Sequence, residues 1–319
     1  MPDIVIAFFA LGLLAGVIKS DLKVPESIYE TLSILLMLTL GLKGGMSLHG
    51  QTATLEPLEL VAVVGLGFAI PLLLFPVLRL LVKLSTSDSA SIAAHYGSVS
   101  AGTFAVVMAL TEAAGWELRP ETTLYLVLLE LPAIVIMLWL HRKLSQNQQD
   151  ATAGSKPQGG NILHEALTSR GVVLLLGGVF IGWLYGPAGL EPLAPMLLGG
   201  FKTLLALFLL EMGLVTAKVF IPLPLKQWRL LAFAATVPFV LAWVGIGTGI
   251  TLGLPAGTVL VLAGLTASAS YIAAPAAIRA AIPDANIGLA MLASLGITFP
   301  VNVLIGIPLY KHWIEALMF

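Results

Sequence analysis

Long apolar runs dominate this chain and limit what it can fold into. A helix needs about 20 mostly apolar residues to cross a bilayer. Turn-forming residues, chiefly proline, glycine and aspartate, separate ten such runs. The runs cover residues 4–18, 29–47, 59–82, 90–113, 121–141, 171–186, 198–217, 229–252, 258–281 and 288–314. We therefore expect an all-α polytopic membrane protein with ten transmembrane helices.

The composition excludes several other classes of protein. Hydrophobic residues make up 58% of the chain and charged residues 10%, whereas soluble domains carry about 25% charged residues. The net charge of −1 gives no basic surface for a nucleic acid. The sequence has no cysteine, which excludes disulfides, thiolate metal sites and cysteine nucleophiles. The lipid bilayer is therefore the expected surrounding of most of the chain.

The basic residues predict an orientation. If ten spans alternate, four of the 16 lysines and arginines fall on the side of the N-terminus and twelve on the opposite side. Lysine and arginine are enriched in cytoplasmic loops. We therefore expect a multi-pass protein of the cell's inner (plasma) membrane, with both termini outside the cytoplasm.

The two halves of the chain resemble each other in three places, in the same order. Residues 32–45 match 204–217, residues 98–101 match 268–271, and residues 130–132 match 298–300, so the offsets are 172, 170 and 168. Each half contains five spans, and an odd number forces the second half to enter the membrane inverted. Inverted repeats are typical of secondary transporters, which bind substrate near the bilayer midplane.

Spans four and nine carry polar and small residues where a helix should be apolar. Two glycines and three hydroxyls lie between residues 95 and 103, and residues 266–271 form a similar segment before Pro275. Broken helices at this depth expose N–H groups that suit an anion. The alternative is close helix packing through small residues. We expect these two segments to form a binding site for an anion.

Acidic residues inside the spans are candidates for cation binding, because a buried acid in a membrane is costly. Glu130 precedes Pro132, which frees a backbone carbonyl one turn earlier. Thr298 and Asn302 supply oxygens at the matching place in span ten. We expect these three residues to bind sodium or to position its ligands. Glu211 is a weaker candidate for cation binding, because a structural hydrogen bond to a neighbouring helix explains a buried acid there at least as well.

Four segments carry a resemblance to a known family. They are VPESIYETLSILLMLTLGLKGG from residue 24, HYGSVSAGTFAVV from residue 95, ASASYIAAPAAIRAAIPDAN from residue 267 and SLGITFPVNVLIGIPLY from residue 294. In these segments, the chain resembles the sodium-dependent bicarbonate transporters of the SbtA type. The resemblance extends over nearly the whole chain.

The resemblance implies a fold and its division. Residues 1–144 would form the first five-helix repeat, 145–170 a cytoplasmic linker and 171–319 the inverted second repeat. Helices 1, 2, 6 and 7 would form a gate domain and the others a core domain. Bicarbonate would bind at the crossing of the broken helices, with sodium beside it and no other cofactor. The resemblance places the substrate ligands at Ser98, Val99, Ser100, Gly102, Thr103, Thr266, Ser268, Ala269, Ser270 and Tyr271. A homotrimer is also implied, and cyanobacterial members bind a PII-like regulatory protein.

The expected function is therefore sodium-coupled bicarbonate uptake by an elevator-like alternating-access motion, and not enzymatic catalysis. The nearest alternative is transport of another small anion or an organic acid, although the spans offer no central basic anchor. A sodium/proton antiporter would need titrating acids at the breaks, where the sequence has no aspartate. A passive channel would need a continuous pore. An intramembrane hydrolase would use Ser98 or Ser100 with His95, but serines duplicated in both repeats favour ligand supply over one nucleophile.

Overall fold

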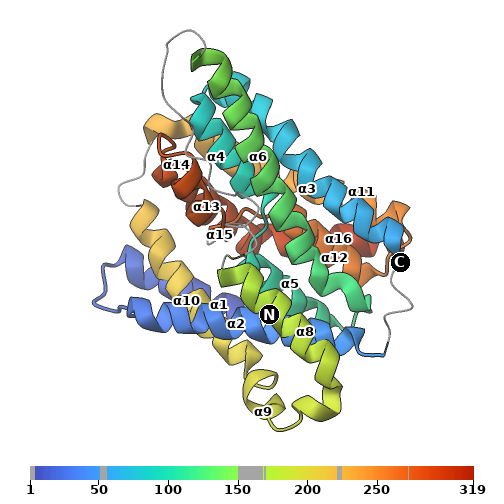
Figure 1. The fold of residues 1–319 in the computed structure, drawn as a ribbon. Coiled ribbons are helices and arrows are strands. Elements are labelled where there is room, and N and C mark those ends of the chain that lie inside the picture. The colour runs from blue at the N-terminus through green and yellow to red at the C-terminus, as the bar shows by residue number, and fades with distance from the viewer. Residues whose placement is uncertain (1–3, 51–55, 150–167, 169, 221–224, 272) are drawn as a thin grey trace.

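A computed structural model describes residues 4–50, 56–149, 168, 170–220, 225–271 and 273–319. Helices and short turns make up the described part of the chain, which contains no β-strand. The first half comprises α1 (Ile4–Val17), α2 (Glu26–Leu48), α3 (Pro57–Val77), η2 (Leu78–Val82), α4 (Thr86–Gly97), α5 (Ala101–Ala114), η3 (Pro120–Leu124) and α6 (Tyr125–Gln149). Figure 1 shows their arrangement.

The second half contains more and shorter elements. They are α8 (Arg170–Leu190), α9 (Ala194–Leu197), α10 (Phe201–Phe220), η4 (Leu225–Gln227), α11 (Trp228–Thr251), α12 (Ala256–Thr266), α13 (Ala273–Ala281), α14 (Ile287–Met291), η5 (Leu292–Thr298), α15 (Phe299–Val301), η6 (Asn302–Gly306) and α16 (Ile307–Met318). Helix α6 extends through Gln149, so the expected linker at 145–170 begins as helix. Residues 150–167 and 169 of that linker lie outside the described residues.

Among the described residues, eight helical stretches are long and apolar enough to cross a membrane. They overlap eight of the ten expected spans. The other two expected spans coincide with shorter apolar helices, Ile4–Val17 and Ala256–Thr266. The 14 residues of α1 rise about 21 Å at 1.5 Å per residue, less than the ~30 Å hydrocarbon core.

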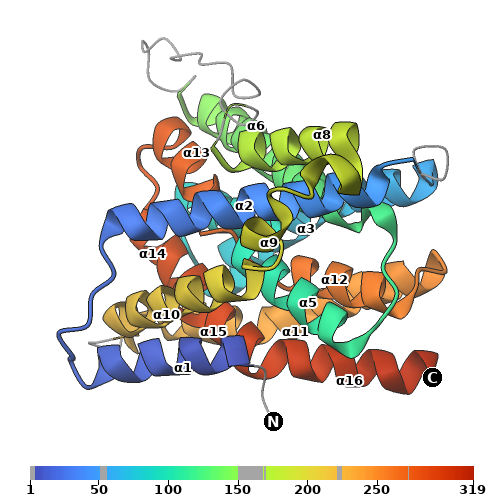
Figure 2. The same ribbon diagram turned by 90° about the horizontal axis from the view of Figure 1, so that it is seen from below.

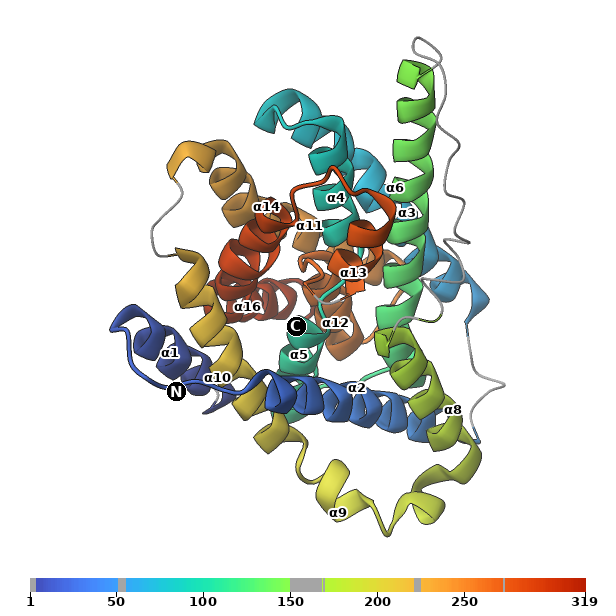
Figure 3. The same ribbon diagram turned by 60° about the vertical axis from the view of Figure 1, so that its left-hand side comes forward.

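Helices α1, α2, α8 and α10 lie together on one side of the molecule with the short α9 beside them, and most of the remaining helices lie beyond α5 (Figures 2 and 3). Within this group, α1 packs along α10 and α2 packs along α8. Glycines allow both pairs to approach closely, because a Cβ at Gly41 would collide with the carbonyl oxygen of Leu175, and one at Gly213 with that of Phe9. The sequence-matched pair Gly41 and Gly213 therefore makes equivalent contacts in the two helix pairs.

The other helices form a second group in which prolines interrupt the backbone hydrogen bonds. Helix α3 packs against α4 and α6, while α11 packs against α12 and η5. Pro71, Pro132 and Pro238 lie inside α3, α6 and α11. A proline inside a helix leaves the carbonyl four residues earlier without its usual donor. These helices surround two polar segments where the chain leaves helical geometry.

Candidate binding site

The first polar segment separates α4 from α5. Helix α4 ends at Gly97 and α5 begins at Ala101, and Ser98 and Ser100 adopt extended backbone angles. Gly97 lies against its neighbours so closely that a Cβ there would come within 2.7 Å of Pro71 and of Ala133. The end of α4 is therefore packed tightly against α3 and α6.

The second polar segment follows α12, which ends at Thr266, and precedes α13, which begins at Ala273. Thr266 donates its hydroxyl hydrogen toward the carbonyl of Leu241 in α11, 2.9 Å away, and toward carbonyls of its own helix. This hydroxyl therefore holds the end of α12 against α11.

Direct hydrogen bonds join the two segments. The amide N–H of Ser270 donates to the carbonyl oxygens of His95 and Ser98, at 2.7 and 2.8 Å. In return, the amide N–H of Ser100 donates to Ser268 Oγ at 2.8 Å. Residues from the two halves of the chain therefore satisfy each other's backbone at one buried place.

The second serine of each pair caps the helix that follows. Ser100 Oγ accepts from the N–H of Thr103 at 3.0 Å, and Ser270 Oγ accepts from the N–H of Ala274 at 3.2 Å. An oxygen in this position satisfies one of the free N–H groups at a helix start. Both helices that follow the polar segments therefore have an early N–H bonded to a serine oxygen, from Ser100 directly before α5 and from Ser270 three positions before α13.

Several buried polar atoms beside this crossing have no hydrogen-bond partner among the described residues. They are Ser98 Oγ, Thr103 Oγ1 and His95 Nε2, whereas the hydroxyl of Tyr271 lies within interaction range of the Ser100 side chain and the Gly102 backbone. Native structures leave few buried polar groups unpaired, so a cluster of them needs an explanation. Tyr271 directs its hydroxyl at Gly102, where a Cβ would collide with it. A polar ligand at the start of α5 would satisfy this set of donors and acceptors.

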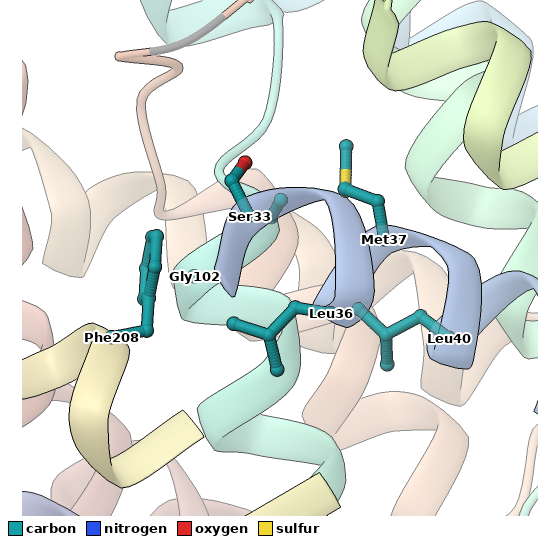
Figure 4. Close-up of a pocket in the computed structure, with 7 residues that line it drawn as sticks. Ser33, Leu36, Met37, Leu40, Gly102 and Phe208 are labelled. Carbon is teal, nitrogen blue, oxygen red and sulfur yellow. The ribbon is translucent and has the colours of Figure 1, made fainter. Parts of the chain in front are cut away.

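A small pocket reaches the same helix start from the side of α2. It is lined by Ser33, Leu36, Met37, Leu40, Ala101, Gly102 and Phe208 (Figure 4). Its volume of about 10 Å³ holds at most one water molecule. The pocket lies between α2, α5 and α10, and therefore between the two helix groups.

The structure uses the remaining candidate substrate ligands differently. Val99 and Ala269 are buried and apolar, at 4% and 2% exposure, so only their backbone can offer polar groups. The Ser268 hydroxyl donates to the carbonyl of Leu265 at 2.8 Å while it accepts from Ser100. Like Thr266, it is already engaged within the protein.

The two candidate sodium ligands of span ten are fully buried and hydrogen bonded. The side-chain amide of Asn302 donates to the carbonyl of Ala267 at 2.7 Å and accepts from the hydroxyl of Tyr310 at 2.8 Å. Thr298 donates to the carbonyl of Ala234 at 2.8 Å, which is the carbonyl that Pro238 frees. Asn302 therefore connects span ten to the end of α12, and Thr298 connects it to α11.

Glu130 differs from both of these residues. It is 3% exposed, and within the described ranges it forms no hydrogen bond, including none to Thr298 or Asn302. The carbonyl freed by Pro132 belongs to Leu128, and it lies 3.2 Å from where a Cβ on Gly67 would be. The structure therefore bonds Asn302 to the second segment and Thr298 to α11, and it shows no hydrogen bond between either residue and Glu130.

A comparison with family models decides the family. The model described as the Na+-dependent bicarbonate transporter superfamily matches residues 4–315. The chain belongs to this superfamily. A search of curated proteins found no significant match. Membership in the bicarbonate transporter superfamily, together with eight helices of spanning length in the described part of the chain, identifies a multi-pass membrane transport protein.

Two buried acids of this superfamily member were not among the candidates from the sequence. Glu59 and Glu121 are 2% and 1% exposed and lie in the first turns of α3 and η3, after Pro57 and Pro120. Acids are common at such positions because they complement the helix dipole at exposed helix starts. The sequence carries no signal that these two are buried. In the described part of the chain, no group of three or more histidines or acids could hold a metal.

Proposed function

We propose that the protein is a sodium/bicarbonate symporter that takes up bicarbonate by alternating access. Membership in the superfamily supports two parts of this proposal, the dependence on sodium and bicarbonate as the substrate. The observation that carries the proposal is the hydrogen-bonded crossing of the two serine segments, with unpaired buried hydroxyls beside it. A transporter that works by alternating access needs a polar site in the moving part, near its boundary with the fixed part, and the pocket at Gly102 lies at the boundary between the two helix groups.

In this proposal, the fold is a five-plus-five inverted repeat with ten spans. Three features support it: the matched glycines contact equivalent carbonyls, the matched serines cap equivalent helices, and the offsets between the matches are nearly constant. Spans four and nine would be the broken helices, formed by α4 with α5 and by α12 with α13. The protein would lie in the inner membrane, with both termini outside the cytoplasm.

The two helix groups would be the two parts that move relative to each other during transport. Helices α1, α2, α8 and α10 would form the gate, and the others the core that carries the substrate. The pocket at Gly102 lies where these groups meet, so a sliding core would change its exposure. A homotrimer joined through gate helices and a cytoplasmic PII-like regulator are further proposals that rest on the family resemblance.

The polar groups beside the crossing suggest how bicarbonate would be held. The hydroxyls of Ser98, Thr103 and Tyr271 would bind its oxygens, together with the N–H groups at Gly102 and at the start of α5. A helix N-terminus favours an anion because its free N–H groups and dipole are positive. Ser100, Thr266, Ser268 and Ser270 would fix the backbone, while Val99 and Ala269 would exclude water.

Sodium would compensate the charge of the substrate. Moving one negative charge inward against an inside-negative potential costs about 2.3 kcal/mol per 100 mV. One co-transported sodium ion removes that cost. Glu130 would bind it, since this buried carboxylate has no hydrogen bond among the described residues. Thr298 and Asn302 would supply or position further oxygens.

The test is uptake of labelled bicarbonate into vesicles with sodium or choline outside. We expect saturable uptake that requires sodium, and uptake unaffected by choline would reject the coupling. Competition with small organic acids separates bicarbonate from the alternative substrate class.

Glu130→Gln should raise the sodium concentration needed for half-maximal uptake, whereas Glu191→Gln, in an exposed turn, should leave it unchanged. Sodium kinetics of Glu130→Gln equal to those of the wild type would remove Glu130 from the site.

A further inference from the structure

A second group of buried oxygens lies at the start of α3 and α6, in elements other than the serine segments. Glu59, Glu121 and Tyr125 are at most 2% exposed there. We propose that Glu59 and Glu121 hold a hard metal cation that takes oxygen ligands, at a site separate from the bicarbonate crossing and from Glu130. This proposal does not depend on the coupling mechanism above.

The carboxylates have free oxygens in a common environment. The hydroxyl of Tyr125 donates to Glu59 Oε1. Glu59 Oε2 and both oxygens of Glu121 are buried and have no hydrogen-bond partner in the described part of the chain. Among the charged groups that act on Glu59, Glu121 is the strongest, ahead of Arg119 and Glu56. The two acids are therefore close enough for their charges to interact.

The backbone that carries Glu121 is held on several sides. The N–H of Arg119 donates to Thr258 Oγ1 of α12 at 2.8 Å, and the hydroxyl of Thr122 donates to the carbonyl of Arg119 at 2.7 Å. On another side, a Cβ on Gly44 of α2 would collide with Thr123. Element η3 is therefore wedged between α2 and α12, and Glu121 is fixed in its buried position.

The charge of Arg119 acts on Glu59, but no basic side chain among the described residues forms an ion pair with Glu59 or Glu121. The ion pairs of the described residues join Lys43 with Glu112, Arg170 with Glu30 and Lys311 with Glu315, and none reaches Glu59 or Glu121. An unpaired buried charge costs several kcal/mol. A proton would remove the charge of Glu121, but it would leave a buried O–H and a buried carbonyl without partners. A bound cation satisfies both oxygens at once.

The ligand chemistry indicates the class of cation. Two carboxylates and a phenol oxygen form an all-oxygen set, which suits Ca²⁺ or Na⁺ and not metals that prefer thiolate or imidazole. The charge of two carboxylates balances a divalent ion, and Ca²⁺ accepts bidentate carboxylates. Sodium shares this chemistry, so both ions are probes of the same site.

Thermal unfolding of the purified full-length protein tests the site. Wild type, Glu121→Gln and the control Glu117→Gln are compared in choline buffer with chelator and without bicarbonate, and Ca²⁺ or Na⁺ is then added. Glu117 lies on the same loop and is exposed. We expect one of the ions to raise the unfolding midpoint of the wild type and the control by about 3 °C or more. Glu121→Gln should show no such rise.

Each outcome decides the proposal. A rise with Ca²⁺, or with Na⁺ alone, that disappears in Glu121→Gln assigns the site to that ion. No rise in the wild type with either ion, or an equal rise in Glu121→Gln, overturns it. If Glu121→Gln does not fold, Glu59→Gln replaces it, and equilibrium binding of radioactive Ca²⁺ and Na⁺ to the wild type gives an independent measurement. Glu130→Gln should keep the rise, which separates this site from the proposed coupling site.

Discussion

Substitution by alanine should have different effects at two serines of the crossing: it should lower the stability of the protein at Ser268 and weaken bicarbonate binding at Ser98. The Ser268 hydroxyl accepts from the N–H of Ser100 and donates to the carbonyl of Leu265. The Ser98 hydroxyl is equally buried but has no partner among the described residues. Alanine at each position therefore removes the same group from two different situations, one structural and one available to a ligand.

The hydrogen bonds give the expected magnitudes. Ser268→Ala leaves the buried N–H of Ser100 unpaired, which costs about 1–3 kcal/mol of stability. The loss of the hydrogen bond to the Leu265 carbonyl costs less, because this carbonyl also accepts from the N–H of Ser268. Ser98→Ala removes no hydrogen bond of the described structure, so its stability should be unchanged or slightly higher. If Ser98 binds bicarbonate, its loss should cost about 1.5 kcal/mol of binding, or roughly tenfold in KM.

Thermal unfolding in detergent and uptake of labelled bicarbonate into proteoliposomes measure the two effects. We expect a lower unfolding temperature for Ser268→Ala and a normal one for Ser98→Ala, with the KM raised about tenfold in Ser98→Ala. A destabilised Ser98→Ala with the KM of the wild type would refute the reasoning. It would show that the Ser98 hydroxyl serves packing.

Two further substitutions test the contacts around this site. Gly102→Ala should reduce uptake at least tenfold, because its Cβ would collide with the hydroxyl of Tyr271, whereas Gly247→Ala has open space and should transport normally. Normal uptake by Gly102→Ala would contradict the close approach. Glu112→Gln should lower the free energy of unfolding by less than about 1 kcal/mol, since its ion pair with Lys43 is partly exposed at 39% and 22%. A larger loss in thermal unfolding would show a stronger link between α2 and α5.

Much of the fold was predictable because the signals are local. Eight spanning stretches overlap the expected spans, since the length of an apolar run is readable from the sequence alone. Helices α4 and α12 end where small and polar residues weaken a helix, at Gly97 and Thr266, but that these places are the breaks of the fourth and ninth spans stays a prediction. The family followed from motifs spread over the whole chain, and the family model confirms it.

The sequence determined the all-helical membrane fold, the family and the places where polar segments occur, because apolar length and helix-breaking residues act within a few positions. Only the tertiary structure decided which hydroxyls are engaged. Ser98 and Ser268 are matched in sequence, yet one is unpaired and the other bonded. It also decided that Glu59 and Glu121 are buried. Burial and hydrogen bonding depend on partners from distant parts of the chain, which no local pattern specifies.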